Sequence, residues 1–388
     1  MALSPEQIET VQATVPLLRE HGEALTTRFY QRMFTDYPEV KTFFNQAHQA
    51  DGRQPRALAD AVLAWAENLH QPAVLQDAVE RIVHKHVSLN IQPEHYPIVG
   101  NSLLAAMQEV GGDAVTPEVV EAWGAAYWEL ANLLIAEEEK VYADHANQPG
   151  GWRGKRAFRV KEKRPESAVI TSFVLEPVDG GPVMDFTPGQ YIGLQLDIDG
   201  ETTQRNYSLS DAPNGRTYRI SVKREPGGHA SRFLHDRVAE GDTLHLFPPA
   251  GDFVLQDNDR PINLVTGGVG ITPAMAMTEA VAGHRPVRFI HAALTRDHHA
   301  FRERVEALAA ANDVAPFFIY EEGQPGDGAH ATGRLDRDRL AEQIDLDGDV
   351  YFLGPTPFMR AVKGALDDLG IPAERQHYEF FGPAEALV

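Results

Sequence analysis

The sequence contains no cysteine. This absence excludes disulfide bonds, iron–sulfur clusters and metals held by thiolates, so a buried metal ion would need histidine, carboxylate, tyrosine or methionine ligands. Long apolar runs are also missing, and none approaches the ~20 residues that a membrane-spanning helix needs. The first residues, MALSPEQIET, have neither the basic region nor the apolar core of a secretory signal. We therefore expect a cytoplasmic protein without a stable membrane anchor.

Positive charge is scarce as well. The chain carries 35 Lys and Arg against 56 Asp and Glu, which gives a formal net charge of −21. Nucleic acids and anionic lipids are bound by basic surfaces, so we do not expect nucleic acid as a partner. The 388 residues exceed the ~250–300 at which a single hydrophobic core stops growing, which predicts two or three domains.

Residues 1–147 have the apolar spacing that is typical of helices. Ser4 and Gln7 have the pattern of a capping box, with Pro5 at the first helical position. A second, separate helix is expected to carry the apolar residues from Leu25 to Phe34. Further helices are expected to begin near residues 54, 75, 93 and 117.

The helix expected over residues 75–89 places one histidine on an otherwise apolar face. His84 falls on the opposite face, which we expect to be solvated together with Ser88. A core histidine that bonds a backbone carbonyl and a buried axial ligand to haem iron both explain the other histidine. The apolar face consists of Leu75, Val79, Ile82, His86 and Leu89.

The last helix of this region repeats that pattern with a carboxylate. Its apolar stripe ends at Glu138, which therefore lies at the edge of a core. A carboxylate that reaches water at a helix end would explain the same position. The stripe consists of Trp123, Tyr127, Leu130, Leu134 and Glu138.

The order and spacing of seven residues in this region resemble those of a bacterial globin. More narrowly, the segment KHVSLNIQPEHYPIVG resembles the haem-proximal segment of the flavohaemoglobins. The seven residues are Tyr30, Phe44, Gln54, Leu58, His86, Tyr96 and Glu138. The resemblance implies an all-α globin domain packed around haem. No C-x-x-C-H motif is present, so the expected haem b is bound non-covalently.

The resemblance also implies a role for each of these residues. His86 would be the proximal iron ligand, hydrogen-bonded by Tyr96 and Glu138, which make its imidazole more basic. On the distal side, the resemblance assigns four further residues. Tyr30 and Gln54 would hydrogen-bond iron-bound oxygen, Leu58 would form the apolar wall and Phe44 would pack on the haem. The sequence leaves open whether a lipid also binds in the distal pocket.

Beyond a linker at residues 147–152 the periodicity changes to that of short strands. Strands are expected over residues 168–175, 191–196, 218–223 and 243–247. Many short strands without long intervening helices favour an antiparallel β-barrel, which we assign to residues 152–258.

Two motifs in this barrel resemble the flavin site of the ferredoxin-reductase family. An arginine can grip a pyrophosphate, a tyrosine ring can lie on the flavin, and a serine can bond the flavin nitrogen that accepts hydride. A glycine loop that opens a helix can hold a phosphate. The resemblance therefore implies bound FAD. The residues are Tyr191, Arg205, Asn206, Tyr207 and Ser208, followed by Gly228 and Ser231.

Residues 259–388 alternate apolar strands with helices, which predicts a doubly wound α/β domain that binds a dinucleotide at the carboxyl ends of its strands. A second turn at Gly354 follows the fourth strand, and Leu353 stands where the family often has cysteine. The resemblance implies NADH or NADPH here. The glycine-rich turn and helix start comprise Gly268, Val269, Gly270, Ile271, Thr272 and Pro273.

The C-terminal segment closely resembles the tail of the same family. The resemblance implies that its aromatic strip covers the flavin, and that Lys85 and Glu379 lie between the two redox centres. The tail residues are Glu379, Phe380, Phe381, Gly382 and Pro383.

Taken over the whole chain, the resemblance to the flavohaemoglobins implies a nitric oxide dioxygenase. NAD(P)H delivers a hydride, whereas haem iron accepts single electrons, and a flavin between them can take the hydride and release single electrons. NAD(P)H would reduce FAD, FAD would reduce haem, and haem with bound oxygen would convert nitric oxide to nitrate. The expected partners are these small molecules, without an obligatory protein partner.

Three alternatives remain open on the sequence alone. The chain could be a haem-based sensor or store of oxygen or nitric oxide. It could instead be a general flavin reductase for ferric iron, quinones or hydroperoxides. A zinc site of His84, His86 and His95 is a third possibility, although the helix faces separate the first two.

Overall fold

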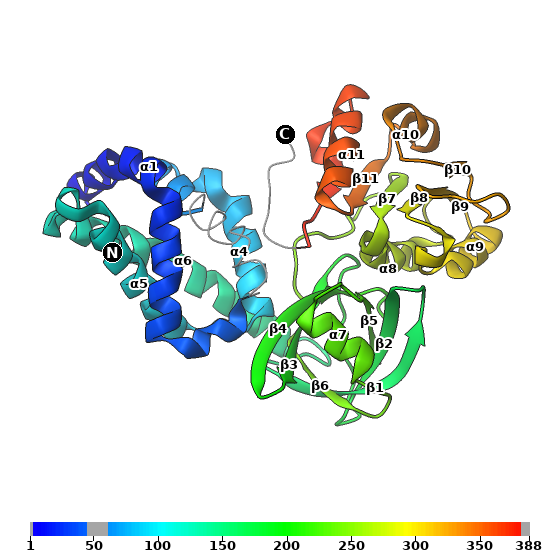
Figure 1. Cartoon of the computed structure of the whole chain (residues 1–388), viewed down its shortest axis with the longest axis horizontal. Helices are drawn as coiled ribbons and strands as arrows, with labels where there is room; N and C mark the ends of the chain where they lie inside the picture. Colours follow the sequence, from blue (N-terminus) through cyan, green and yellow to red (C-terminus); the bar gives the residue numbers. More distant parts are fainter. Residues whose placement is uncertain (1–2, 45–60, 382–388) are drawn as a thin grey trace. The chain divides into compact units, whose positions relative to one another are not determined.

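The computed structural model describes residues 3–44 and 61–381, which divide into two compact units (Figure 1). The first unit comprises residues 1–147 together with 197–205, and the second comprises residues 148–196 and 206–388. The expected Gln54 and Leu58, and the C-terminal Gly382 and Pro383, lie outside the described residues. Each unit is described by itself.

The first unit is helical, as predicted. Residues 61–67 are also helical. Its helices are α1 (Pro5–Asp36), α4 (Gln76–Ser88), α5 (Tyr96–Gly111) and α6 (Pro117–Asn147), with short 3-10 turns at Pro38–Phe43, Pro72–Leu75, Pro93–His95 and Gly112–Ala114.

The expected division of the first 38 residues into two helices is wrong, because α1 is continuous through Pro16. A proline inside a helix removes one hydrogen bond and costs ~3 kcal/mol. Pro16 is exposed, whereas Val11, Phe29 and Met33, from both halves of the helix, are buried in one core. Burial of this continuous face outweighs the local cost of the proline. The capping box at Ser4 is present as predicted.

The apolar face expected on helix α4 is half-buried in the structure. Its buried residues are Val83, Val87 and Ser88, whereas His86 and its apolar neighbours on the expected face are half-buried. Ser88, expected in solvent, is fully buried because its hydroxyl donates to the Lys85 carbonyl at 2.7 Å. The His86 face therefore borders the core rather than lying within it.

A six-stranded sheet follows in the order β4-β3-β6-β1-β2-β5, and its pairings β1–β2, β1–β6, β2–β5 and β3–β6 are antiparallel. The sheet belongs to the second unit except for residues 197–205, the end of β3 and most of β4, which are grouped with the first. An isolated bridge between Leu209, just after β4, and Ile220 of β5 connects the two ends of the sheet and curls it into a barrel. Its strands are β1 (Arg156–Pro165), β2 (Ile170–Pro177), β3 (Tyr191–Ile198), β4 (Glu201–Ser208), β5 (Tyr218–Lys223) and β6 (Thr243–Leu246), with helix α7 (His229–Asp236).

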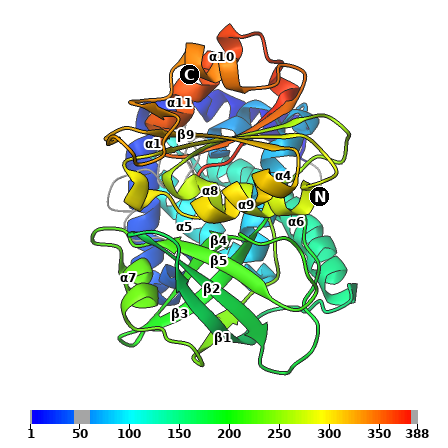
Figure 2. The same ribbon diagram turned by 90° about the vertical axis from the view of Figure 1, so that its right-hand side faces the viewer.

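The remaining sheet is parallel, in the order β10-β9-β8-β7-β11-β12. Helices α8 and α9 cover one face and α10 and α11 cover the other (Figure 2). This is the predicted doubly wound architecture. The elements are β7 (Ile262–Gly267), α8 (Ile271–Val281), β8 (Val287–Ala293), α9 (Arg302–Ala311), β9 (Val314–Tyr320), β10 (Ala331–Thr332), α10 (Arg337–Gln343), β11 (Asp349–Leu353), α11 (Thr356–Asp368) and β12 (Gln376–Tyr378).

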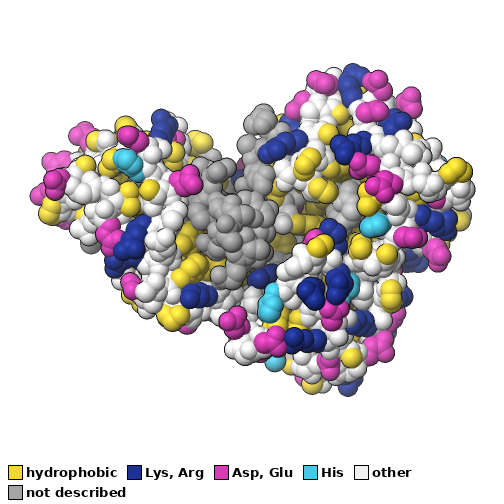
Figure 3. Space-filling model, viewed as in Figure 1, with side chains coloured by type: hydrophobic (Ala, Val, Ile, Leu, Met, Phe, Trp, Pro, Cys, Tyr) yellow, Lys and Arg dark blue, Asp and Glu magenta, His cyan; other side chains and the backbone are white. Residues whose placement is uncertain are grey.

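No helix within residues 3–44 and 61–381 is both long enough and apolar enough to span a membrane. On the face drawn in Figure 3, Lys and Arg groups are interspersed with Asp and Glu groups.

A buried histidine lies in the middle of the parallel sheet. His291 on β8 is fully buried, and its Nδ1 lies 2.8 Å from the hydroxyl of Thr266 on the neighbouring strand β7. Burial lowers the pKa of His291 to about 3. The folded chain therefore keeps this side chain neutral at pH values where a solvated imidazole takes up a proton.

This lowered pKa predicts acid destabilisation. Between pH 6.5 and about 3 the unfolded chain binds a proton at His291 and the folded chain does not, so the free energy of unfolding falls as the pH falls. The contribution at pH 5 is on the order of 2 kcal/mol. Urea unfolding followed by circular dichroism at pH 7 and pH 5 should show a smaller pH dependence in His291→Asn than in the wild type. The exposed His284→Asn is the control, and equal pH dependence in both variants would contradict the prediction.

Candidate functional site

Helices α4, α5 and α6 bring three polar side chains together in the first unit. Nδ1 of His86 lies 2.7 Å from Oε1 of Glu138 and 3.1 Å from the hydroxyl of Tyr96. The Tyr96 hydroxyl donates to the same carboxylate oxygen at 2.5 Å. Glu138 is 2% exposed, so its charge is stabilised by these contacts rather than by water. The structure thus brings the three predicted proximal residues together.

The chemistry of these groups fixes the histidine tautomer. A carboxylate only accepts hydrogen bonds, and the single Tyr96 proton is already donated to it, so the proton between His86 and Glu138 belongs to Nδ1. Nε2 then carries the lone pair. A neutral imidazole whose other nitrogen donates to a carboxylate is the usual form of a metal-ligating histidine. The residues present therefore fit an axial ligand to haem iron.

Burial raises the pKa of the Tyr96 phenol, and the nearby Glu138 carboxylate raises it further. Tyr96 therefore remains protonated and keeps donating to Glu138 throughout the physiological pH range. The hydrogen bond from Tyr96 that holds the Glu138 carboxylate in place therefore persists across this pH range.

Two further tyrosines on α6 hold the backbone around the histidine. The Tyr127 hydroxyl donates to the Tyr96 carbonyl at 2.6 Å, and the Tyr142 hydroxyl donates to the Ile91 carbonyl at 2.7 Å. The Tyr127 ring lies so close to Gly100 that an added Cβ there would approach it to 2.5 Å. The sequence places Tyr127 on the apolar stripe, but it gives no sign of these hydroxyl contacts with distant carbonyls.

The distal residues that the structure describes form an aromatic cluster. The Tyr30 ring centroid lies 5.6 Å from those of both Phe34 and Phe44, and Tyr30 is 7% exposed. The structure thus places Tyr30 and Phe44 in contact. Their roles toward a ligand, and those of Gln54 and Leu58, stay predictions.

The zinc alternative finds no support in the part of the chain that is described. There, no three His, Asp or Glu side chains converge as a metal site would require. His95 instead accepts a hydrogen bond from the Gln92 backbone through Nδ1 at 2.9 Å, and its ring packs on Phe43.

The flavin motif lies on β4 and its neighbour β3. Arg205 donates through Nη1 to the Thr203 hydroxyl at 2.7 Å and to the Gln204 carbonyl at 2.6 Å, while Ser208 is buried at the end of the strand. Asn206 and Tyr207 lie between them on β4, half-buried. A guanidinium, a phenol and a hydroxyl within four consecutive residues have the chemistry to bind a pyrophosphate, a flavin ring and a ring nitrogen.

Tyr191 and the glycine loop complete this region. The Tyr191 ring lies so close to Gly251 that a Cβ on that glycine would approach it to 2.9 Å. Gly228 caps the N-terminus of α7, and a Cβ there would lie 2.5 Å from the Ser231 hydroxyl, which accepts from the Glu225 backbone. The close contact with Ser231 favours glycine at position 228. The backbone N–H groups at this start of α7 are the kind of group that binds anions.

The nucleotide loop follows β7 at the carboxyl edge of the parallel sheet. Gly268 has φ +55°, and a Cβ at Gly270 would lie 2.4 Å from the Leu353 carbonyl at the end of β11. The Thr272 hydroxyl donates to the Val269 carbonyl at 3.0 Å and fixes the turn into α8. Two strand-to-helix turns therefore meet where such sheets bind dinucleotides. Ile271 and Pro273 are buried in the first turn of α8.

The described part of the C-terminal tail is aromatic and partly exposed. Tyr378 packs on Phe352 of β11 with centroids 5.1 Å apart, and Phe380 packs edge-on against Tyr378 at 6.0 Å. Glu379 is half-buried and Phe381 is 47% exposed. The prediction that this strip covers a flavin, and that Glu379 lies near the exposed Lys85, stays a prediction.

Comparison with known families matches three ranges of the chain. Residues 27–134 match the Globin family, residues 157–255 match an oxidoreductase FAD-binding domain, and residues 264–364 match an oxidoreductase NAD-binding domain. The helical unit, the antiparallel barrel and the parallel sheet described above correspond to these families in order. The predicted fold class is confirmed.

Relatives share this organisation over their full length. A flavohemoprotein of Pseudomonas aeruginosa is 59% identical over 99% of this chain and 99% of its own, and one of Burkholderia sp. is 55% identical over 99% and 100%. The crystal structure of a flavohemoglobin from Malassezia yamatoensis, with bound FAD and heme, covers 98% of this chain and 100% of its own at 28% identity, with a TM-score of 0.88.

A partial structure resembles the second half of the chain. The flavohem-like FAD/NAD-binding domain of nitric oxide dioxygenase from Vibrio cholerae is 41% identical and has a TM-score of 0.56. It covers 59% of this chain and 99% of its own length.

The hydrogen bond from His86 to Glu138 predicts the effect of neutralising that carboxylate. Glu138→Gln should lower haem affinity or turnover by ~10–100-fold, because the imidazole loses the acceptor that orients it and makes it basic. Haem transfer to a scavenger protein measures the affinity. Glu137→Gln, one residue earlier and paired with Lys140 on the surface, is the matched control. Equal haem loss from both variants would contradict the assignment.

Proposed function

The chain belongs to the flavohemoprotein family, and we propose that it is a nitric oxide dioxygenase that draws its electrons from NADH or NADPH. We place the globin domain at residues 1–147, the FAD domain at 152–258 and the nucleotide domain at 259–388, and the three family matches fall inside these limits. The chain is an NAD(P)H-dependent oxidoreductase with haem and FAD as its cofactors.

His86 would hold the haem iron through Nε2, and the barrel motif would hold FAD. When bound, FAD converts a hydride into single electrons and haem supplies the iron at which dioxygen and nitric oxide react. The protein side chains bind the reactants, orient them and hold protons.

On the globin side, Glu138 keeps the His86 proton on Nδ1, and Tyr96 keeps the carboxylate in place at 2.5 Å. The result is an electron-rich imidazole whose orientation does not change, which favours oxygen chemistry over reversible storage. Tyr30, in its aromatic cluster, would donate a hydrogen bond to dioxygen in the pocket. Gln54 would do the same beside an apolar wall of Leu58 and Phe44.

On the reductase side, Arg205 would bind the FAD pyrophosphate and Tyr207 would lie on the flavin ring. Ser208 would hydrogen-bond the nitrogen that accepts hydride. The backbone N–H groups around Gly228 and Gly268 would bind phosphates of the two nucleotides. Lys85 and Glu379 would tune the potentials of the two redox centres.

The observation that carries the proposal is the pairing of His86 with the buried carboxylate of Glu138 in a globin that shares its chain with a reductase. A sensor or store has no need of its own reductant, so the two parts together favour turnover. A general flavin reductase has no need of a carboxylate buried behind the histidine. We further propose a cytoplasmic site, where reduced nicotinamide nucleotides are available, and small molecules as the substrates.

The proposal predicts that nitric oxide consumption requires NADH or NADPH and dioxygen. Nitrate should form in equal amount to the nitric oxide lost, measured with a nitric oxide electrode and anion chromatography. Cyanide and carbon monoxide bind haem and should inhibit this activity. Reduction of ferric iron or quinone at full rate, with nitric oxide consumption absent, would favour the general reductase instead.

The proposed role of Tyr30 predicts the effect of removing its hydroxyl. Tyr30→Phe should release dioxygen faster and turn over more slowly, because the bound ligand loses a hydrogen-bond donor while the ring and its packing remain. A loss of ~1 kcal/mol corresponds to roughly a fivefold change in off-rate. Flash photolysis measures this rate, and Tyr37→Phe is the control. An off-rate equal to that of the wild type would remove Tyr30 from the mechanism.

A further inference from the structure

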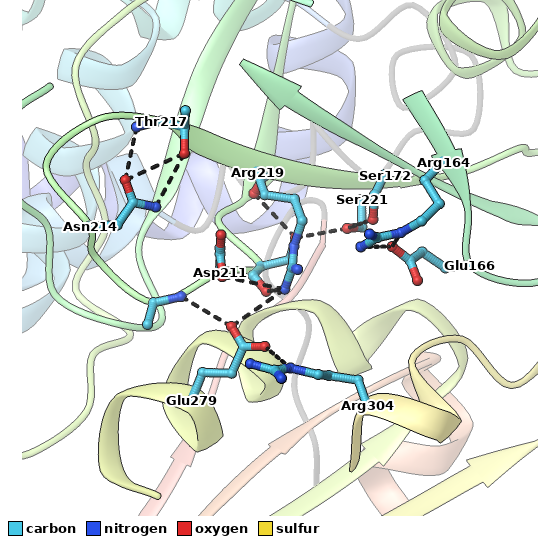
Figure 4. A network of polar contacts seen from close by, with 12 residues as sticks. Arg164, Glu166, Ser172, Asp211, Asn214, Thr217, Arg219, Ser221, Glu279 and Arg304 are labelled. Atoms are coloured by element: carbon cyan, nitrogen blue, oxygen red, sulfur yellow. Dashed lines mark hydrogen bonds and ion pairs between the residues drawn. The ribbon is translucent and has the colours of Figure 1, made fainter. Parts of the chain in front are cut away.

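A cluster of charged side chains, with Arg219 and Glu279 buried at its centre, joins the barrel to the nucleotide domain within the second unit (Figure 4). Arg219 on β5 and Glu279 on α8 have side chains that are 9% and 5% exposed, and their Nη2 and Oε2 atoms lie 3.6 Å apart. On the other side, Glu279 accepts from Nε of Arg304 on α9 at 2.8 Å. The carboxylate is therefore held between two guanidinium groups from different domains.

Further contacts fix Arg219 to the barrel. Its guanidinium donates to the Ser210 carbonyl and, at 3.2 Å, to the Ser210 hydroxyl. The hydroxyls of Ser210, Ser221 and Ser172 continue this network across the sheet at 2.7 and 2.8 Å. The cation also lies over the Phe301 ring, 5.1 Å from its centroid. These contacts fix the position of the Arg219 guanidinium relative to the barrel.

Glu279 has a second acidic neighbour from the barrel. Asp211 lies 3.8 Å from Nη2 of Arg219, and burial together with this second acidic group raises the pKa of Glu279. The backbone N–H of Ala212 also approaches Oε2 at 3.4 Å. With Arg304, the cluster contains two positive and two negative side chains. Removal of one buried charge leaves its partners uncompensated, so such clusters favour one specific arrangement more than they add stability.

The cluster lies beside both predicted binding motifs in the sequence. Ser210 and Asp211 lie two and three residues after Ser208, the last residue of the flavin motif. Glu279 is on α8, the helix that begins immediately after the glycine-rich turn ending at Gly270. A shift of α8 relative to the barrel would therefore move the nucleotide site relative to the flavin site.

We propose that Glu279, held between Arg219 and Arg304, is a positioning residue for hydride transfer from nicotinamide to flavin. The inference rests on the proposed function. The two reacting rings are bound by different domains and must approach to about 3–3.5 Å, and a misplacement of about 1 Å costs ~100-fold in rate. The cluster fixes α8 against β5 and so sets this approach without touching either ring.

The test is anaerobic stopped-flow reduction of the flavin by NADH in the full holoprotein. In Glu279→Gln the rate constant of flavin reduction at saturating NADH should fall at least ~10-fold relative to the wild type. The dissociation constant of NADH should stay within about threefold of the wild-type value. The long-wavelength charge-transfer absorbance of stacked nicotinamide and flavin should weaken in parallel. Dithionite, which needs no docking, should reduce the flavin of both proteins equally.

Two other variants separate positioning from folding. Glu176→Gln makes the same chemical change in the exposed pair with Arg159 on the barrel, and should leave the rate constant unchanged. Arg304→Met removes a half-exposed side chain with little risk to folding and should slow hydride transfer, and Arg304→Lys should restore most of the rate.

An unchanged rate constant in Glu279→Gln and Arg304→Met would overturn the inference. So would weaker NADH binding with full hydride-transfer rate at saturation, because the cluster would then act on binding alone. If neither NADH nor NADPH reduces the wild-type flavin, the proposed function itself fails. If NADH reduces the wild type and both variants alike, only this inference fails.

Discussion

The hydrogen bond from Nδ1 of His86 to the buried carboxylate of Glu138 is the contact on which the account of the globin unit depends. It assigns the proton to Nδ1 and leaves the lone pair on Nε2, which is the form of histidine that the proposed function requires as a ligand to haem iron. The surrounding tyrosines serve this contact: Tyr96 bonds the carboxylate, while Tyr127 and Tyr142 fix the backbone of the segment that follows α4. Without the buried charge, the same helices would form an ordinary apolar core.

A second constraint is the mismatch between hydride donors and one-electron acceptors. A nicotinamide gives up two electrons together, so a flavin must lie between it and the haem. The reductase part of the chain combines two folds, an antiparallel barrel and a parallel α/β sheet. The barrel presents its motif on β4, and the parallel sheet gathers its turns at the carboxyl edge. The buried ions between β5 and α8 give these two folds one defined arrangement, because a cluster of balanced charges tolerates little displacement.

Local patterns in the sequence predict much of this architecture. Helix starts at proline, the glycine-rich turn and the apolar strands of the parallel sheet are determined by a few neighbouring residues. The predictions that failed did so because contacts between residues far apart in the sequence decide the structure there. Helix α1 passes through Pro16 because its buried face continues on both sides. Strand β1 was not expected, because only Phe158 and Val160 of its ten residues are apolar and buried.

The same distinction applies to the candidate site. His86 and Glu138 were found because a polar residue on an apolar helix face stands out in the sequence, whereas Tyr96 was assigned only through the resemblance to the flavohaemoglobins. Arg219 and Glu279 were missed, because an arginine on a strand and a glutamate on a helix are ordinary until the fold brings them 3.6 Å apart. The most direct test of the central claim is the visible spectrum of the holoprotein under argon, before and after NADH. The account predicts a haem band that NADH converts to the ferrous form through the flavin. A flavin that NADH bleaches beside a haem band that does not change, or a protein that takes up no haem, would contradict it.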